Sequence, residues 1–146
     1  MTSTGRTRVG VVVVAAAAAL AAAVALAGDA APQGARVDAL LAQPLPDLPG
    51  KEVVMATVEY LPGGASLPHR HDAHVFVYVL EGTLRMQVAG RALQTLGPGQ
   101  VFYEGPGDVH QTSANASATA PAKFLVVVLK DRDRPLSRPA AAAAAQ

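Results

Sequence analysis

The segment that decides the fold is Gly63-Gly64-Ala65-Ser66-Leu67-Pro68-His69-Arg70-His71, which is followed by the apolar run 75–80 and by Gly82. Side chains of an extended strand alternate between its two faces, so His69 and His71 project to the same side. Two imidazoles on one face form half of a metal site. The segment therefore predicts a metal-binding β-structure if a third ligand lies nearby in the fold.

The third histidine belongs to a second turn-rich segment, Gly99-Gln100-Val101-Phe102-Tyr103-Glu104-Gly105-Pro106-Gly107-Asp108-Val109-His110. Together the two segments resemble the cupin family, whose motifs run G-x5-H-x-H-x3,4-E-x6-G and G-x5-P-x-G-x2-H-x3-N. The matching positions are Gly63, His69, His71 and Gly82 in the first motif and Gly99, Gly107 and His110 in the second. The resemblance spans roughly residues 53 to 130. It implies a small antiparallel β-barrel, or jelly roll, with a metal ligated by His69, His71 and His110.

The chain departs from the family pattern at three positions. Val75 stands where the first motif has its glutamate, Gly105 takes the proline position, and Ala114 takes the asparagine position with Asn115 one residue later. Valine cannot ligate a metal. The remaining ligand set resembles the three-histidine variant of the cupin site, which occurs among dioxygenases that cleave carbon–carbon bonds or oxidise thiols.

The pattern of turns predicts an all-β fold independently of the motifs. Glycine, proline and asparagine recur at short intervals, and the runs between them are rich in Val, Phe, Tyr, Thr and Leu. Such runs, with no helical period between them, are typical of an antiparallel sandwich or barrel. The expected strands cover residues 53–60, 75–80, 83–88, 92–96, 101–104, 109–113 and 124–129.

The flanking segments predict processing and disorder. Residues 1–27 combine Arg6 and Arg8 with an apolar run that ends in Ala25-Leu26-Ala27, the pattern of a cleaved signal peptide. A retained membrane anchor is the alternative, because the run is nearly long enough to span a bilayer. We expect cleavage, no stable membrane anchor, and a periplasmic or secreted domain. Residues 28–50 are expected to be a linker with a helical turn at 37–41, residues 51–130 the barrel, and residues 131–146 a disordered Ala-rich tail.

Two further residues are candidate ligands. Glu104 reaches the site if Phe102 and Glu104 face inward, and it points outward if Val101 and Tyr103 do; the sequence leaves both open. His74 lies three residues after His71, which in a regular strand puts it on the opposite face, in a surface or rim role. The side chains expected to line the pocket are Val75, Val77, Met86, Phe102 and Tyr103.

The ligand types limit the chemistry. Neutral imidazoles suit Zn, Cu, Fe and Ni, and an added carboxylate favours Mn or Fe, so the expected cofactor is a divalent transition metal of unresolved identity. The expected function is a small metalloenzyme, dioxygenase- or isomerase-like, acting on an anionic or phenolic small molecule; the alternative is a non-catalytic cupin that binds or senses a small ligand. The cupin scaffold hosts both.

Composition excludes several other classes. The chain has no cysteine, which excludes disulfides and thiolate ligands. It has no basic stripe and no tryptophan, so nothing suggests a nucleic-acid partner. The runs 75–80 and 124–129 are apolar on both faces, so each needs cover on both faces. We therefore expect a homodimer that pairs through these strands.

Overall fold

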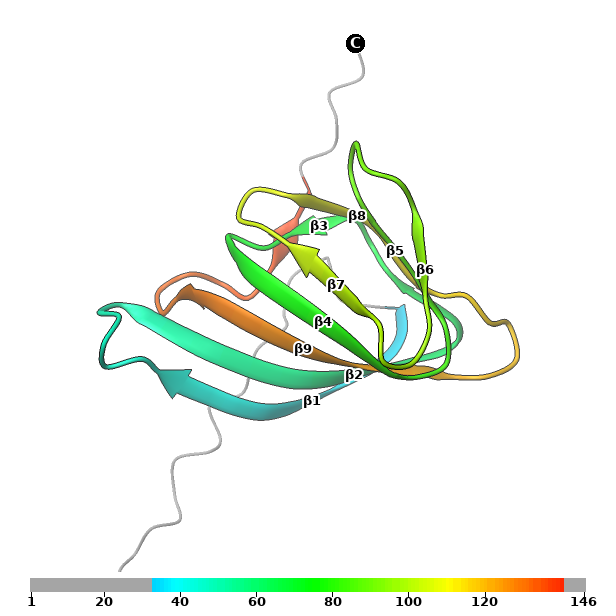
Figure 1. Ribbon diagram of the computed structural model, residues 1–146, viewed down its shortest axis with the longest axis horizontal. Helices are drawn as coiled ribbons and strands as arrows, with labels where there is room; N and C mark the ends of the chain where they lie inside the picture. Colours follow the sequence, from blue (N-terminus) through cyan, green and yellow to red (C-terminus); the bar gives the residue numbers. More distant parts are fainter. Residues whose placement is uncertain (1–32, 141–146) are drawn as a thin grey trace, which may run out of the picture.

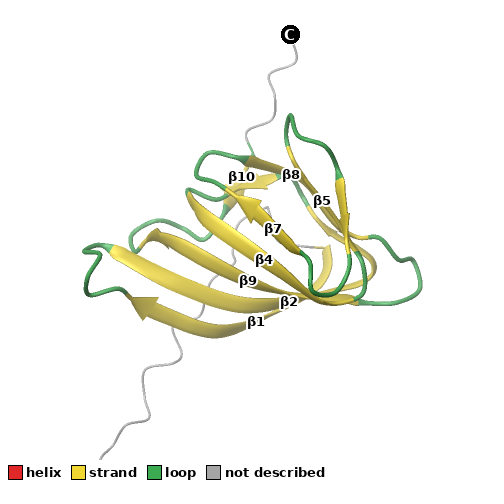
Figure 2. Cartoon of the chain, in the orientation of Figure 1, coloured by secondary structure: helices red, strands yellow, loops and turns green. Residues whose placement is uncertain are grey.

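A computed structural model describes residues 33–140 of the chain, and every described element of regular structure is a β-strand (Figures 1 and 2). The predicted signal peptide, residues 1–27, lies outside the described residues. Within residues 33–140 we find no helix of the length and apolarity needed to cross a membrane. The strands are β1 (Gln33–Pro44), β2 (Lys51–Ser66), β3 (His69–Arg70), β4 (Ala73–Glu81), β5 (Leu84–Val88), β6 (Gln94–Leu96), β7 (Val101–Glu104), β8 (Val109–Asn115), β9 (Ala122–Asp131) and β10 (Arg138–Pro139).

The strands form a nearly closed antiparallel barrel, as predicted. The hydrogen-bonded order is β10-β3-β8-β2-β9-β4-β7, with β1 added to β2 and the β5–β6 hairpin added to β8. In Figure 1 strands β1, β2, β9, β4 and β7 form one wall, and β3, β8, β5 and β6 form the wall opposite. Strand β2 joins the two walls because it pairs with β9 along most of its length and with β8 at its end, residues 65–66.

The core lies between the two walls and consists of every second side chain along the strands. In β4 every second residue from Ala73 to Val79 is buried, and the residues between them are exposed. The same alternation buries Leu84, Met86 and Val88 of β5. At about 25 cal/mol for each Å² of apolar surface removed from water, this interior is the main source of folding free energy. We therefore expect the barrel to fold without a metal.

The family glycine Gly82 is required by a close approach of two chain segments. It has a φ of 73°, and a Cβ atom there would lie 2.5 Å from the carbonyl oxygen of Pro121. Residues other than glycine rarely adopt that backbone conformation, and the space that a Cβ atom would occupy is filled by the backbone before β9. Only glycine fits, which explains why this position belongs to the motif.

The structure corrects both predicted flanks. Residues 33–44 form strand β1, paired with β2 from Pro44↔Glu52 to Gln33↔Ala65, so the helical turn expected at 37–41 is wrong and the expected linker contains a strand of the sheet. Residues 131–140 are not a disordered tail, because β9 extends to Asp131 and β10 pairs with β3. Proline and alanine content suggested loose chain at both places, but pairing with a neighbouring strand outweighs local propensity.

Candidate metal centre

Three histidines, from β3, from β8 and from the residue that follows β3, meet at one end of the barrel interior. His69 lies in β3 and is the direct cross-strand partner of His110 in β8, and His71 follows β3 by one residue. One ring nitrogen from each histidine lies within 4.8 Å of the other two. The His-x-His spacing and the β3–β8 pairing thus bring together the three residues that the sequence predicted.

A bulge in β8 extends this inward-facing row. The register between β5 and β8 shifts after Val88↔His110, so that Gln87 pairs with Thr112. The extra residue, Gln111, is exposed, and Ser113 becomes the next buried side chain after His110. His110 and Ser113 therefore face the same interior despite their odd separation.

The hydrogen bonds of the three rings determine which nitrogen faces the site. Nδ1 of His69 lies 2.8 Å from the carbonyl oxygen of Leu67, and Nδ1 of His71 lies 2.6 Å from that of Leu136. A carbonyl oxygen only accepts, so each Nδ1 carries the proton and each Nε2 of a neutral ring carries a lone pair. The two Nε2 atoms are 3.1 Å apart. Two lone pairs at that distance repel each other unless a cation lies beside them.

His110 is oriented in the same sense by a carboxylate. Its Nδ1 lies 2.9 Å from Oε1 of Glu104, and both side chains are almost completely buried. Its Nε2 is buried and has no hydrogen-bond partner within residues 33–140. An unpaired buried nitrogen costs about 1–3 kcal/mol. All three rings therefore present an Nε2 lone pair to one place, which is the donor set of a divalent transition metal.

Burial keeps the His69 imidazole neutral at physiological pH. Desolvation, opposed in part by the hydrogen bond to Leu67, lowers the pKa of the His69 imidazole to about 4. Burial by itself raises the pKa of Glu104, but the hydrogen bond from His110 and the nearby imidazoles bring it below its ordinary value. At pH 7 His69 is thus a neutral ligand, and the carboxylate beside His110 is ionised.

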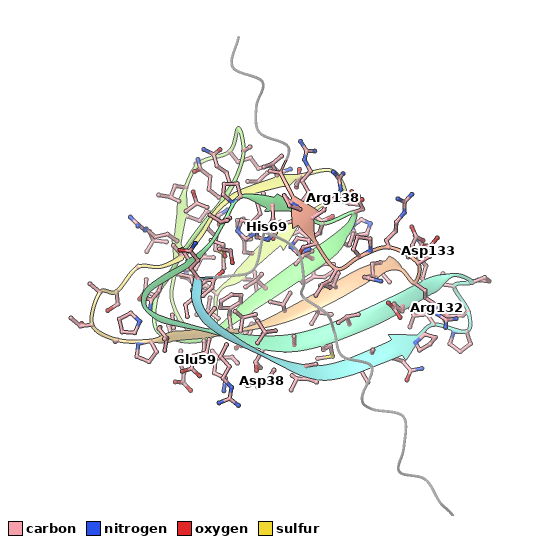
Figure 3. The ribbon with its side chains drawn as sticks, turned by 180° about the vertical axis from the view of Figure 1, so that it is seen from behind. Asp38, Glu59, His69, Arg132, Asp133 and Arg138 are labelled. Atoms are coloured by element: carbon pink, nitrogen blue, oxygen red, sulfur yellow. The ribbon has the colours of Figure 1, made fainter. Side chains whose placement is uncertain are left out.

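The chain after β9 supports the other two histidines. Leu136 supplies the carbonyl that holds His71, and Pro139 of β10 pairs with His69. Figure 3 shows His69 beside the strand that carries Arg138. The Arg138 guanidinium makes two hydrogen bonds, of 2.9 and 3.1 Å, to the Asp72 carboxylate. Residues 131–140, predicted to be a tail, thus form part of the wall of the site.

The structure separates the two additional candidates. Phe102 and Glu104 face inward, whereas Val101 and Tyr103 face outward. His74 is exposed on the outer face, where its Nδ1 lies 2.8 Å from the Tyr103 hydroxyl and its ring stacks on the Tyr103 ring. His74 is therefore no ligand of this site, in keeping with the surface role that strand alternation favoured.

Most of the predicted pocket residues do line the interior. Val75, Val77, Met86 and Phe102 are each no more than 5% exposed, and the Phe102 ring stacks on His110 at a centroid distance of 5.5 Å. Tyr103 is the exception. It is 44% exposed and packs against Phe76 on the outside of the barrel, so its expected place in the pocket is wrong.

Sequence reasoning missed a buried hydroxyl cluster in the same interior. The Tyr60 hydroxyl lies 2.8 Å from Oγ of Ser113 and 2.5 Å from Oγ of Ser66. Burial raises the pKa of the Tyr60 phenol, against the effect of the two serine hydrogen bonds, so it remains a hydroxyl. The strand periodicity of β2 gave a signal for Tyr60, because it faces inward in line with Val54 and Ala56.

Asn115 has a structural role in place of the motif asparagine. Its amide nitrogen donates to the carbonyls of Leu61 and Ala120 at 3.1 and 2.8 Å, and its oxygen accepts from the Ser117 amide. The side chain is 4% exposed. These hydrogen bonds tie β8 to Leu61 of β2 and to the loop before β9.

The fold and the site define a class, a small β-barrel protein with a buried three-histidine centre. The family model described as "Cupin domain" matches residues 56–128, half of the chain. The chain belongs to the cupin family.

Its curated relatives are larger proteins. Over 98 residues the chain is 38% identical to a rice protein (Oryza sativa subsp. japonica) designated germin-like protein 3-2, covering 62% of this chain and 44% of the relative. It is 36% identical over 84 residues to germin-like protein 1-1 of the same organism, covering 54% and 39%. The chain thus spans less than half the length of these relatives.

Solved structures show the same fold. The polyketide cyclase RemF from Streptomyces resistomycificus superposes with a TM-score of 0.56 and 25% identity, covering 74% of this chain and 72% of that one. A cupin-like protein from Thermotoga maritima superposes with a TM-score of 0.53 and 18% identity, covering 71% and 84%. An oxalate oxidase in complex with glycolate gives 0.54 and 22%, covering 71% and 54%.

Proposed function

We propose that this cupin binds one divalent transition metal through His69, His71 and His110 and acts as a small metalloenzyme on an anionic or phenolic molecule. One observation carries the proposal: the partners of the three Nδ1 atoms turn all three Nε2 lone pairs toward one place. The fold relatives named as a cyclase and an oxidase are compatible with an enzyme and do not identify its reaction.

The ligand set determines which molecules suit the site. When bound, a divalent transition ion supplies Lewis-acid activation of an oxygen donor. Three neutral imidazoles leave its charge uncompensated by any directly bound ligand, so an enolate, diketonate or catecholate is favoured over a neutral molecule. The apolar wall of Val75, Val77 and Phe102 excludes water and strengthens that attraction. The Tyr60–Ser113 hydroxyls lie on the same inward face and offer hydrogen bonds to a substrate oxygen.

The test is metal content after single substitutions. His69→Ala, His71→Ala and His110→Ala are each expected to lose stoichiometric Zn(II) or Co(II) binding while circular dichroism shows an intact barrel. His74→Ala is the matched control, because it also removes a histidine side chain, three residues from His71 and exposed on the outer face. Metal binding unchanged in all three site variants contradicts the proposal.

Turnover separates the enzyme from its alternative. A metal-loaded protein that binds catecholates or diketonates but converts none of them under air belongs to the class of non-catalytic ligand-binding cupins. Conversion that requires both the metal and His110 supports the enzyme.

We also propose a homodimer through the outer faces of β4, β7 and β9. Phe76, Tyr78, Val101 and Tyr103 are each at least 44% exposed there and line a groove of about 470 Å³ together with Leu125. An apolar patch of this kind is unusual on a monomer. Light scattering is expected to give a dimer that Tyr78→Lys dissociates; a monomeric mass for the unmodified protein at micromolar concentration contradicts it.

We further propose export, supported by the basic start and the apolar run of residues 1–27. Intact mass is expected to show a mature chain that begins near Gly28. A membrane-bound form that retains Met1 contradicts it.

A further inference from the structure

Glu104 lies directly across the sheet from the position where the cupin pattern has its metal-binding glutamate. That position is Val75 in β4, and its cross-strand partner in β7 is Glu104. Both side chains face inward, and each is 1% exposed. Directly opposed residues in an antiparallel pair have Cβ atoms about 4.5–5.5 Å apart. The chain thus lacks a carboxylate at position 75 of β4 and carries a buried carboxylate at position 104, directly opposite on β7.

The carboxylate contacts one particular histidine. Oε1 of Glu104 lies 2.9 Å from Nδ1 of His110, whereas His69 and His71 donate to backbone carbonyls. The oxygens of Glu104 are not among the ligand atoms that lie within 4.8 Å of one another in the three-histidine group. Glu104 therefore contacts the three-histidine group through His110 and is not itself one of the candidate ligands.

An ionised carboxylate is expensive to bury, so this placement needs an explanation. Moving a carboxylate from water into a protein interior costs several kcal/mol unless it is well paired. Its second oxygen, Oε2, has no partner within residues 33–140, and its only described hydrogen bond is the one to His110. The sequence around it is apolar, and strand packing alone favours an apolar residue at an inward position of β7.

We propose that Glu104 is the positioning carboxylate of this metal centre, displaced by one strand from the family position and acting through His110. The proposal rests on the proposed function, metal binding by the three histidines. Accepting the Nδ1 proton holds the His110 ring with Nε2 toward the ion and makes that nitrogen a stronger donor. The metal thereby keeps three neutral ligands, while a negative charge lies one residue further out and partly balances the ion.

The arrangement has a consequence for specificity. A carboxylate bound directly favours hard ions such as Mn, whereas three imidazoles favour Zn, Cu, Fe or Ni. Displacing the carboxylate from position 75 to position 104 also leaves the β4 side of the site lined by a valine. We therefore expect this chain to prefer the softer ions.

The test compares Glu104→Gln with Glu81→Gln, a control that removes an exposed carboxylate at the end of β4. Zn(II) affinity is measured by chelator competition, and the coordination number from the intensity of the Co(II) ligand-field bands. Glu104→Gln is expected to bind about 10–100-fold more weakly than the unmodified protein, with unchanged Co(II) intensity. Unchanged affinity overturns the proposal, and so does a change in coordination number, which would make Glu104 a direct ligand.

A second measurement needs no variant and so does not depend on the folding of Glu104→Gln. In the Zn(II)-loaded protein, nitrogen-15 NMR is expected to show the proton of His110 on Nδ1, slow to exchange and hydrogen-bonded. A proton on Nε2 overturns the proposal. If the unmodified protein binds no metal at all, the proposed function fails and this inference fails with it; if it binds metal and Glu104→Gln binds equally well, only this inference fails.

Discussion

Replacing Val75 by glutamate restores the family carboxylate beside the one that the chain already has. Val75 is 1% exposed, and its neighbours on the two adjacent strands are Glu104 and Val128. Without metal, Val75→Glu places a second carboxylate in an apolar interior next to the first. Two carboxyl groups this close cannot both be ionised at little cost, and an uncompensated buried charge lowers the free energy of unfolding by about 3–5 kcal/mol.

The expected shift in melting temperature follows from that cost. In a domain of this size 1 kcal/mol corresponds to roughly 4–8 °C, so metal-free Val75→Glu is expected to melt at least about 12 °C below the unmodified protein. A metal ligated by the new carboxylate returns about 2.7 kcal/mol when its free concentration is 100 times the dissociation constant. Added Mn(II) is therefore expected to raise the melting temperature of Val75→Glu by about 10 °C or more, and by less in the unmodified protein.

Differential scanning calorimetry with and without Mn(II) measures both effects. Val75→Gln is the matched control, because it adds the same volume without a charge and is expected to show little response to Mn(II). The double variant Val75→Glu/Glu104→Gln removes the repulsion between the carboxylates and is expected to recover part of the lost stability without metal. The same melting temperature for Val75→Glu with and without metal refutes the reasoning, because position 75 then does not face a metal centre.

Three further results are expected. Deleting residues 135–146 removes the Leu136 carbonyl that holds His71 together with β10, so Zn(II) affinity should fall about tenfold with the barrel still folded; unchanged affinity in chelator competition contradicts this. Lowering the pH of the metal-free protein from 6.5 to 4 should reduce its free energy of unfolding, measured in urea, by up to about 3 kcal/mol. His69 has a folded-state pKa of about 4, below its unfolded value, so its contribution is present above pH 6.5 and is lost toward pH 4; the same loss in His69→Gln contradicts the assignment. Asn115→Ala removes a buried side chain that donates to the carbonyls of Leu61 and Ala120, and the free energy of unfolding should fall by about 1–3 kcal/mol; a change below about 0.5 kcal/mol in urea unfolding contradicts its structural role.

Much of the fold was predictable because strand alternation is a local property. The turn residues and the apolar runs located seven of the ten described strands, although β2 extends to Ser66, well past its expected end at residue 60. The spacing of His69 and His71 put both imidazoles on one face. The two-residue strand β3 was not among the expected strands, and strands β1 and β10 were missed for a physical reason. Their residues have weak or misleading local propensity, and they become strands by pairing with β2 and β3.

Glu104 illustrates the limit of the site prediction. Whether its side chain points into the barrel depends on which residues of β7 face inward. A short strand with two aromatic residues in succession is compatible with either alternation, so the sequence does not determine which set faces inward. The pairing of β7 with β4 decides the phase, because it places Phe102 and Glu104 opposite Val77 and Val75. The same phase sends Tyr103 outward.

The sequence alone determined the fold class, the three candidate histidine ligands and the absence of a glutamate at position 75, because motif spacing and strand period are local properties that do not depend on distant contacts. The tertiary structure decided which carboxylate contacts His110, which nitrogen of each ring faces the other two, and that the chain beyond β9 lies against His69 and His71. Each of these depends on contacts between residues far apart in the chain, such as His71 with Leu136, and no local pattern encodes a contact that only the closed barrel creates.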